Sequence, residues 1–257
     1  AEKALLERGF KPTLKGQAAT PGPFLIRRSR LIDPPMTDHP RKRLYGRSQG
    51  HKLSTRQQRL IDTLGDELAW PDEGVLDPAE LLPGLSAHVL EIGFGAAEHL
   101  MGQAQNHPET GYLGVEPFLN GVAKALTGIE EQDLKNLRVK RADARDEIPR
   151  MPDASVDRIF LLFPDPWPKR RHAKRRFVQP ETASEFARIL KPGGRLRVAT
   201  DVGVYAGHAL PILLETPGLE WTAWSARDWR DNPADHIVTR YQSKHLGDIE
   251  PVFFDFV

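Results

Sequence analysis

The chain of 257 residues contains no cysteine. Disulfides, cysteine-ligated zinc and thiol catalysis are therefore excluded, and a cytoplasmic location is expected. No apolar run approaches the roughly 18 residues that a membrane-spanning helix needs. The N-terminal AEKALLERGF also lacks the charged-then-apolar order of a secretory signal. The histidines show no HxxxH-type spacing, so no metal site is expected. With 39% hydrophobic residues, the chain can build a proper core but is not expected to enter a membrane.

The net charge of +1 hides an uneven distribution along the chain. Residues 1–60 hold 14 Lys and Arg against 4 Asp and Glu, whereas residues 61–257 hold 22 against 31. A basic head on an acidic body favours a polyanionic partner, although a solvated tail would have the same composition. Residues 1–59 show weak periodicity and are expected to form a partly irregular basic extension. Residues 60–257 are expected to form the folded domain.

Short apolar runs alternate with longer mixed segments from about residue 74 onward. The pattern predicts strands at 87–93, 111–116, 137–142, 157–163, 194–200 and 251–257. It predicts helices near 97–106, 118–128, 180–190 and 203–215. This alternation indicates an α/β fold with a Rossmann-like, doubly wound and mostly parallel sheet. Ligands of such sheets bind outside the carboxyl ends of the strands, where the strand order reverses.

The segment VLEIGFGAAEHL places Gly93 and Gly95 between a predicted strand and a predicted helix. Glycines at such a point allow a tight turn and a close approach of a ligand to the backbone. A dinucleotide-binding loop has a further glycine where Ala96 and Ala97 stand, which weakens a dehydrogenase interpretation. The E-x-G-x-G form, which begins at Glu91, resembles instead the first motif of S-adenosylmethionine-dependent methyltransferases.

Acidic residues stand at or near most of the predicted strand ends. S-adenosylmethionine carries an ammonium group, two ribose hydroxyls and an adenine amino group, and carboxylates can accept hydrogen bonds from each of them. Glu116 in GVEP would accept from the ribose hydroxyls, and Asp143 in RADARD from the adenine. Glu91 would receive the ammonium end. The sequence therefore predicts a cofactor site that contains Glu91, Gly93, Gly95, Glu116 and Asp143.

The most unusual stretch is LLFPDPWPKRRHAKRR, residues 161–176. Pro164 and Pro166 fix two φ angles and remove two N–H donors, so the loop that carries Asp165 is expected to be stiff. A stiff strand exit suits a residue that must be aimed at a substrate. Six cations then follow within eight residues, a density that repels itself unless an anion such as a phosphate backbone is bound. His172 lies among them and is expected to be pushed toward its neutral form.

This stretch closely resembles the signature of the bacterial tRNA (guanine-N7-)-methyltransferase family. EIGFG, GVEP, LKPGG followed by VATD, and TRYQSKHLGD also match in order and spacing, so the resemblance covers roughly residues 86–257. It implies methyl transfer from S-adenosyl-L-methionine to N7 of a guanine in the variable loop of tRNA, at position 46. It implies that Asp165 is catalytic and contacts the cofactor beside Glu91, Glu116 and Asp143. It also implies that tRNA is contacted by Lys169, Arg171, Lys174, Arg175, Arg176, Asp201, Thr239, Arg240, Tyr241 and Gln242.

Two positions depart from the family pattern. Ala97 stands where glycine is common, so slightly altered cofactor packing is expected. Gln242 stands where the family usually has glutamate; it keeps an acceptor oxygen but loses the charge, which leaves its role open. Asp201 has a second interpretation, as the cap of a helix that starts near Val204.

Guanine N7 carries an in-plane lone pair and no proton, so its methylation needs no general base. The work expected of Asp165 is orientation and the stabilisation of developing positive charge. Two alternatives stay open. One is a methyltransferase of the same fold that acts on another RNA position or on a non-tRNA substrate. The other is a non-catalytic nucleic-acid-binding protein on this fold. The sequence does not indicate whether the chain is a monomer or a homodimer.

Overall fold

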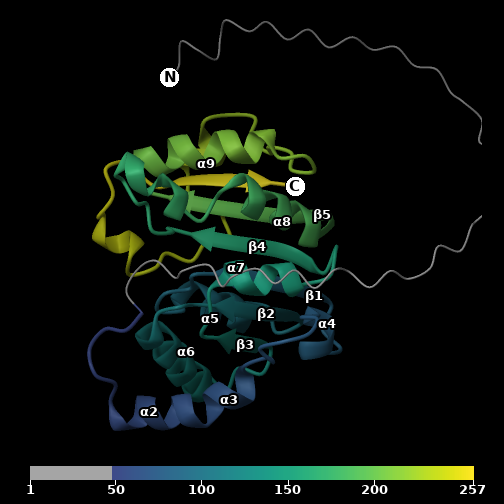
Figure 1. Ribbon diagram of the computed structural model, residues 1–257, viewed down its shortest axis with the longest axis vertical. Coiled ribbons are helices and arrows are strands. Elements are labelled where there is room, and N and C mark those ends of the chain that lie inside the picture. Colours follow the sequence, from purple (N-terminus) through teal and green to yellow (C-terminus); the bar gives the residue numbers. More distant parts are fainter. Residues whose placement is uncertain (1–47) are drawn as a thin grey trace, which may run out of the picture. The chain divides into compact units, whose positions relative to one another are not determined.

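The computed structural model describes residues 48–257, in which a six-stranded sheet forms the centre (Figure 1). The strands lie in the order β3-β2-β1-β4-β5-β6. The first five are parallel, and β6 runs antiparallel to β5. Their bounds are β1 Ala87–Ile92, β2 Thr110–Val115, β3 Leu137–Lys140, β4 Val156–Leu162, β5 Leu190–Thr200 and β6 Val252–Phe256. The predicted strands and the doubly wound α/β class are thereby confirmed, with the strand order reversing between β1 and β4.

Helices cover both faces of the sheet. The longer ones are α2 Thr55–Asp62, α5 Glu98–Asn106, α6 Leu119–Gln132, α8 Pro180–Ile189 and α9 Gly203–Glu215. Shorter pieces are α3 Leu64–Leu68, α4 Pro78–Leu81, α7 Ala144–Glu147 and α10 Arg227–Arg230, with 3-10 turns η1 Ile148–Arg150, η2 Arg170–Arg175 and η3 Gln242–Lys244. The four helices predicted from periodicity are α5, α6, α8 and α9, each within a few residues of its expected range.

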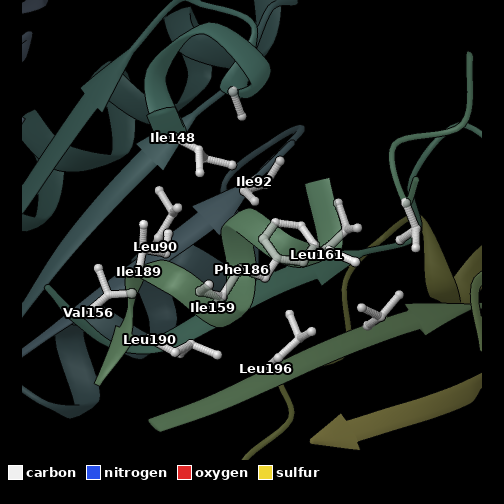
Figure 2. Packing of buried hydrophobic residues seen from close by; sticks show 14 of the residues in the cluster. Leu90, Ile92, Ile148, Val156, Ile159, Leu161, Phe186, Ile189, Leu190 and Leu196 are labelled. Carbon is white, nitrogen blue, oxygen red and sulfur yellow. The ribbon is translucent and has the colours of Figure 1, made fainter. Parts of the chain in front are cut away.

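Two apolar clusters hold the helices against the sheet. On one face, side chains of α2, α3, α5 and α6 pack on alternate residues of the strands, among them Val89 and Phe160. On the other face, α8 and α9 pack on the intervening residues, such as Leu90 and Ile159. Figure 2 shows part of this second cluster, with Phe186 of α8 beside Leu161 of β4. Strands β1 and β2 are buried almost throughout, as expected for central strands of a parallel sheet.

Helix α2 lies partly inside the segment that the sequence predicts to be an irregular extension. It starts at Thr55 with a capping box, in which the Ser54 hydroxyl accepts from Gln57 N and the Gln57 side chain accepts from Ser54 N. Arg56 and Arg59 form ion pairs with Glu130 of α6. Residues 48–59 therefore pack on the domain. The remainder of the predicted extension, residues 1–47, lies outside the described residues.

Candidate active site

The loop between β1 and α5 turns sharply at the point where the strand order reverses. Gly93 and Gly95 have φ angles of 71° and 55°, in the left-handed region that favours glycine. Ala97, the N-cap of α5, has a φ of 62°, which explains why a glycine would also suit this position. Gly121 of α6 approaches so closely that an added Cβ would lie 2.3 Å from Gly95 O. The loop is therefore held in place and presents its backbone to the cavity outside it.

Glu116, at the end of β2, is the carboxylate that holds this loop. Its Oε2 accepts from Gly95 N at 2.7 Å and its Oε1 accepts from Phe118 N at 2.9 Å. Burial raises the pKa of Glu116, and the nearby charges of Asp165 and Glu91 act in the same direction, against the two backbone hydrogen bonds. Each oxygen keeps a further lone pair, so Glu116 can still accept from a ligand.

Asp143, at the end of β3, caps helix α7. Its Oδ1 accepts from Arg145 N at 3.0 Å, and its Oδ2 pairs with the Arg145 guanidinium at 3.3 Å. Asp143 and Glu116 line one cavity of about 300 Å³ together with Gly93, Gly95 and Asp165. The structure thus brings five of the predicted cofactor residues to one place. Arg145 lines the same cavity and was missed, although its position two residues after Asp143 in RADARD was visible in the sequence.

Glu91 does not line this cavity. Its carboxylate Oε2 lies 2.7 Å from His99 Nδ1, and both side chains are almost fully buried. Glu91 borders a neighbouring cavity of about 370 Å³, on the other side of the glycine loop. The pairing with His99 was not predicted, because the two residues belong to a strand and a helix that meet only in the folded chain.

The loop that carries Asp165 is braced at both ends. Phe163 and Trp167 have φ angles of 50° and 43°, which are strained for bulky residues. Phe163 N donates to Ala199 O at 2.8 Å. The Arg176 guanidinium donates to Pro166 O at 3.0 Å and to Trp167 O at 3.2 Å. The expected stiffness of this loop thus rests on hydrogen bonds as well as on the prolines.

Asp165 itself is open to the cavity. Although the side chain reaches solvent, the surrounding loop removes enough water to raise the pKa of its carboxyl group. Tyr241 lines the same cavity, and its ring lies 5.6 Å from that of Phe163. Burial raises the pKa of Tyr241, and the charges of Asp201 and Asp165 raise it further.

The basic run divides into exposed and inward-facing cations. Lys169, Arg171 and Lys174 are exposed around η2. Arg176 is 5% exposed and donates its hydrogen bonds to the loop of Asp165, so its position does not fit the predicted contact with tRNA. The Arg175 guanidinium stacks on the Trp167 ring at 4.9 Å and lines the cavity. Desolvation and the charges of Arg175, Arg171 and Lys169 lower the pKa of His172, in the expected direction.

Asp201, at the end of β5, is buried and does not cap α9. The first residue of that helix, Gly203, donates its N–H to Asp248 Oδ1 at 2.7 Å, so the capping interpretation of Asp201 is wrong. Asp201 lines a surface hollow together with Gln242. Asp201 O also accepts from Ile249 N at 3.1 Å.

The segment around residues 239–242 contacts the start of α5. Gln242 is buried, with Oε1 2.7 Å from His236 Nε2 and Nε2 3.1 Å from Asn232 Oδ1. Its N–H donates to Thr239 Oγ1 at 3.3 Å. Gln242 therefore organises this segment. Arg240 is exposed, and its N–H donates to Glu98 Oε2 at 2.6 Å.

An ion network anchors the same segment to the sheet and was not predicted. Asp235 pairs with Arg158 at 2.6 Å and with Arg197 at 2.7 Å, and Arg197 also pairs with Asp255. Burial acts to raise the pKa of Asp235, but the Arg197 hydrogen bond and the charges of both arginines outweigh it and lower that pKa to about 2. Gln103 of α5 adds a hydrogen bond to Asp235 O at 2.6 Å.

Two kinds of feature are missing from residues 48–257. No group of three or more His, Cys, Asp or Glu side chains there is arranged to hold a metal ion. None of the described helices has the length and apolar character required to cross a membrane.

Comparison with known proteins places the chain among methyltransferases. The family model described as "Putative methyltransferase" matches residues 86–253. A tRNA (guanine-N(7)-)-methyltransferase of Hyphomonas neptunium is 52% identical over 215 residues, which cover 83% of this chain and 98% of the relative. One of Caulobacter vibrioides is 48% identical, over 86% of this chain and 97% of the relative.

Solved structures give a more distant likeness. The 16S rRNA methyltransferase KamB is 14% identical with a TM-score of 0.48, over 71% of this chain and 94% of that one. This likeness is too distant to add to the assignment, which rests on the sequence relatives. Their similarity extends over most of both chains, and the family model spans the glycine loop, the FPDPW loop and the segment around residues 239–242. The chain therefore belongs to the tRNA (guanine-N(7)-)-methyltransferase family.

Proposed function

We propose that this protein transfers the methyl group of S-adenosyl-L-methionine to N7 of a guanine in tRNA, in the variable loop at position 46. The observation that carries the proposal is the convergence of three strand ends on one cavity. Glu116, Asp143 and Asp165 line it with the glycine loop, and exposed cations of η2 stand beside it. Acidic groups suit the cofactor's hydroxyls and amines, whereas the cations suit a phosphate backbone.

The residues of the cavity fit this cofactor. Glu116 keeps lone pairs for two hydroxyls after its bonds to the backbone, and Gly95 presents an uncrowded backbone beside it. The carboxylate of Asp143 forms an ion pair with Arg145, and Asp143 lines the cavity together with Glu116 and Asp165. When bound, S-adenosylmethionine supplies an electrophilic methyl group on a sulfonium centre. The volume of about 300 Å³ lies at the lower end of those usual for small-molecule pockets.

Asp165 would act by position and charge. Attack by N7 moves positive charge onto the purine, and N7 has no proton to remove, so a base is not required. A carboxylate held on a braced loop can accept from the guanine edge and stabilise the cation as it forms. Burial raises the pKa of the Asp165 carboxyl group.

Phosphates of the tRNA would be received by Lys169, Arg171 and Lys174. These side chains are exposed next to the loop of Asp165 and form no ion pair with any described residue. Thr239, Arg240 and Tyr241 line the neighbouring cavity of about 370 Å³, and Thr239 Oγ1 accepts a hydrogen bond from Gln242 N. We also propose a cytoplasmic location, because the proposed substrate is tRNA.

The test is an analysis of the product. The protein is incubated with unmodified tRNA and methyl-labelled S-adenosylmethionine, and the tRNA is digested to nucleosides for mass spectrometry. Label in 7-methylguanosine supports the proposal, and sequencing of the tRNA then locates the modified position. Label in another nucleoside would favour the alternative substrate. Cofactor and tRNA binding without any transfer would favour a non-catalytic binding protein.

A further inference from the structure

Arg145, the second residue of α7, lies between the cavity of about 300 Å³ and the basic run of η2. Its side chain is 15% exposed and lines the cavity beside Asp143. One guanidinium nitrogen, Nη1, lies 3.3 Å from Asp143 Oδ2, and the other, Nη2, donates to Arg175 O at 3.0 Å. The guanidinium carbon lies over the Phe177 ring, 4.6 Å from its centroid. One rigid, planar group therefore connects the end of β3 to the end of η2.

The 3-10 helix η2 has few supports of its own. It spans six residues, which is long for this kind of helix, and none of these residues is buried. Segments with few buried contacts are the least stable parts of a fold, so their arrangement depends on the bonds that hold their ends. The C-terminal end of η2 is held by Arg145 and by Gln179, whose Nε2 donates to Ala173 O at 2.9 Å and to Arg176 O at 3.1 Å. Of these two residues, only Arg145 lines the cavity.

The same helix carries two of the exposed cations, Arg171 and Lys174, that are proposed above to receive phosphates. Since phosphates would bind these side chains in the arrangement that η2 has when its end is anchored, tRNA favours the bond from Arg145 to Arg175 O. A cofactor whose adenine is bound by Asp143 favours the same position of Arg145 from the other side. Two ligands that favour one arrangement of a shared group increase each other's affinity.

We infer that Arg145 is a positioning residue that couples the binding of tRNA to the binding of the cofactor. The inference rests on the proposed function and adds a residue to it. The guanidinium acts through the Asp143 carboxylate on one side and through the backbone of η2 on the other. By linkage, tRNA tightens cofactor binding by the same factor by which the cofactor tightens tRNA binding. The protein then holds the two ligands together more often than their separate affinities would give.

The test measures the coupling directly. The dissociation constant of S-adenosylhomocysteine, which has no methyl group to transfer, is measured by equilibrium dialysis without tRNA and with a saturating unmodified tRNA transcript. In the wild type, tRNA should lower this constant by at least about five-fold, the lower end of typical couplings. In Arg145→Met, which keeps the aliphatic stem on Phe177, the ratio should fall to within about two-fold. Arg145→Lys should do the same, because one ammonium cannot hold two acceptors as the guanidinium fork does.

The matched control is Arg150→Met. The Arg150 side chain is 16% exposed, pairs with Glu147 at 2.6 Å and donates to Pro71 O at 2.7 Å, but it does not line the cavity. This variant should lose stability and keep the wild-type coupling, which separates a coupling role from a merely structural one. Full coupling in either Arg145 variant, or the same loss of coupling in the control, would overturn the inference.

The wild type separates the inference from the proposed function. Binding of both ligands, with a dissociation constant for S-adenosylhomocysteine that tRNA does not change, would overturn the inference and leave the proposed function intact. Failure of the wild type to bind S-adenosylhomocysteine or tRNA at all would contradict the proposed function, and the inference with it.

Discussion

The two loops that border the first cavity reach a left-handed backbone by different routes. The loop after β1 uses Gly93 and Gly95, for which positive φ carries no steric cost. The loop after β4 places Phe163 and Trp167 in the same region, where side chains cost roughly 1–2 kcal/mol each. Buried Arg176 and the Phe163–Ala199 hydrogen bond hold that second loop against its strain.

The difference follows from what each loop has to present. The first presents bare backbone, so glycine both turns the chain and leaves room for a ligand. The second loop presents one carboxylate, that of Asp165, to the cavity. The residues that flank Asp165 are held by prolines, by ring contacts and by the Arg176 guanidinium. Strained, over-determined segments of this kind are typical of functional sites. The following predictions test this contrast between a loop that leaves room for a ligand and a loop that orients a carboxylate.

The largest effect is expected for Asp165→Asn. Loss of the negative charge should reduce kcat by about 10²- to 10³-fold, because in the proposed mechanism the carboxylate acts mainly on the cationic transition state. The dissociation constant for tRNA should stay within about two-fold. Single-turnover rates and filter binding separate the two quantities. Equal losses in rate and binding would show that Asp165 only helps to hold the substrate.

Gly95→Val tests the other loop. A β-branched residue at a φ of 55° is strained, and its side chain would point toward the cavity, so S-adenosylmethionine should bind at least about ten-fold more weakly. The control is Gly74→Val, which has a φ of 85° in a loop outside the cavity. It should carry a similar strain and leave the affinity unchanged. Calorimetry of both variants gives the comparison, and equal affinities would contradict the role given to Gly95.

Arg176→Ala and Lys174→Ala separate the brace from the exposed cations. Arg176→Ala leaves two partly buried carbonyls without the Arg176 donors and should lower the free energy of unfolding by about 2 kcal/mol, with a loss of turnover. Lys174→Ala should change stability by less than about 0.5 kcal/mol, raise the KM for tRNA and reduce its salt dependence. Urea denaturation measures the stability of each variant, and the KM for tRNA at several salt concentrations measures substrate binding. The same changes in both variants would contradict the separate roles of Arg176 and Lys174.

Asp165→Asn, which should lower the activity, should slightly raise the stability of the folded protein. Burial raises the pKa of Asp165 in the folded chain, so its ionised form disfavours folding at neutral pH. The variant should therefore melt slightly higher than the wild type above that raised pKa. The gap should close as the pH falls below the ordinary aspartate value, where both states are protonated. A lower Tm for the variant at pH 7 would mean that the loop depends on the charge.

The smallest effect is expected for Ala97→Gly. The glycine relieves a left-handed alanine but gives up a fully buried methyl group and adds backbone entropy to the unfolded chain. These contributions oppose each other, so stability should change by less than about 1 kcal/mol, and cofactor affinity should change little. Thermal melts with and without S-adenosylhomocysteine measure both. A large gain would show that Ala97 is a defect in this chain.

The sequence predicted the parts of this fold that depend on local pattern. Strands β1 to β6 and helices α5, α6, α8 and α9 have runs long enough for their period to be visible. Helix α2 was missed because TRQQRLID is polar and follows a basic, Pro-rich stretch. Helices α4, α7 and α10 have four residues each, too few to show a period.

The sequence predicted which residues belong to the candidate site, but it predicted their arrangement only in part. Glu116, Asp143 and Asp165 follow different strands, and parallel strands bring their ends together. No local pattern shows which of six adjacent cations turns inward, so Arg176 was grouped with its exposed neighbours. The Glu91–His99 pair joins a strand to the helix that follows it, and the Asp235 network joins residues far apart in the chain. Only the packing of α5 and of the segment around Asp235 reveals these contacts.

The most direct test of the central claim removes the acceptor atom. A tRNA is transcribed with 7-deazaguanine in place of guanine, which replaces N7 by a carbon and keeps the Watson–Crick edge. The protein should bind this tRNA, since the contacts we propose are with phosphates and the base edge, but should transfer no methyl group from labelled S-adenosylmethionine. Normal tRNA in the same assay should be methylated. Transfer to the deaza tRNA at the normal rate would contradict methylation at N7.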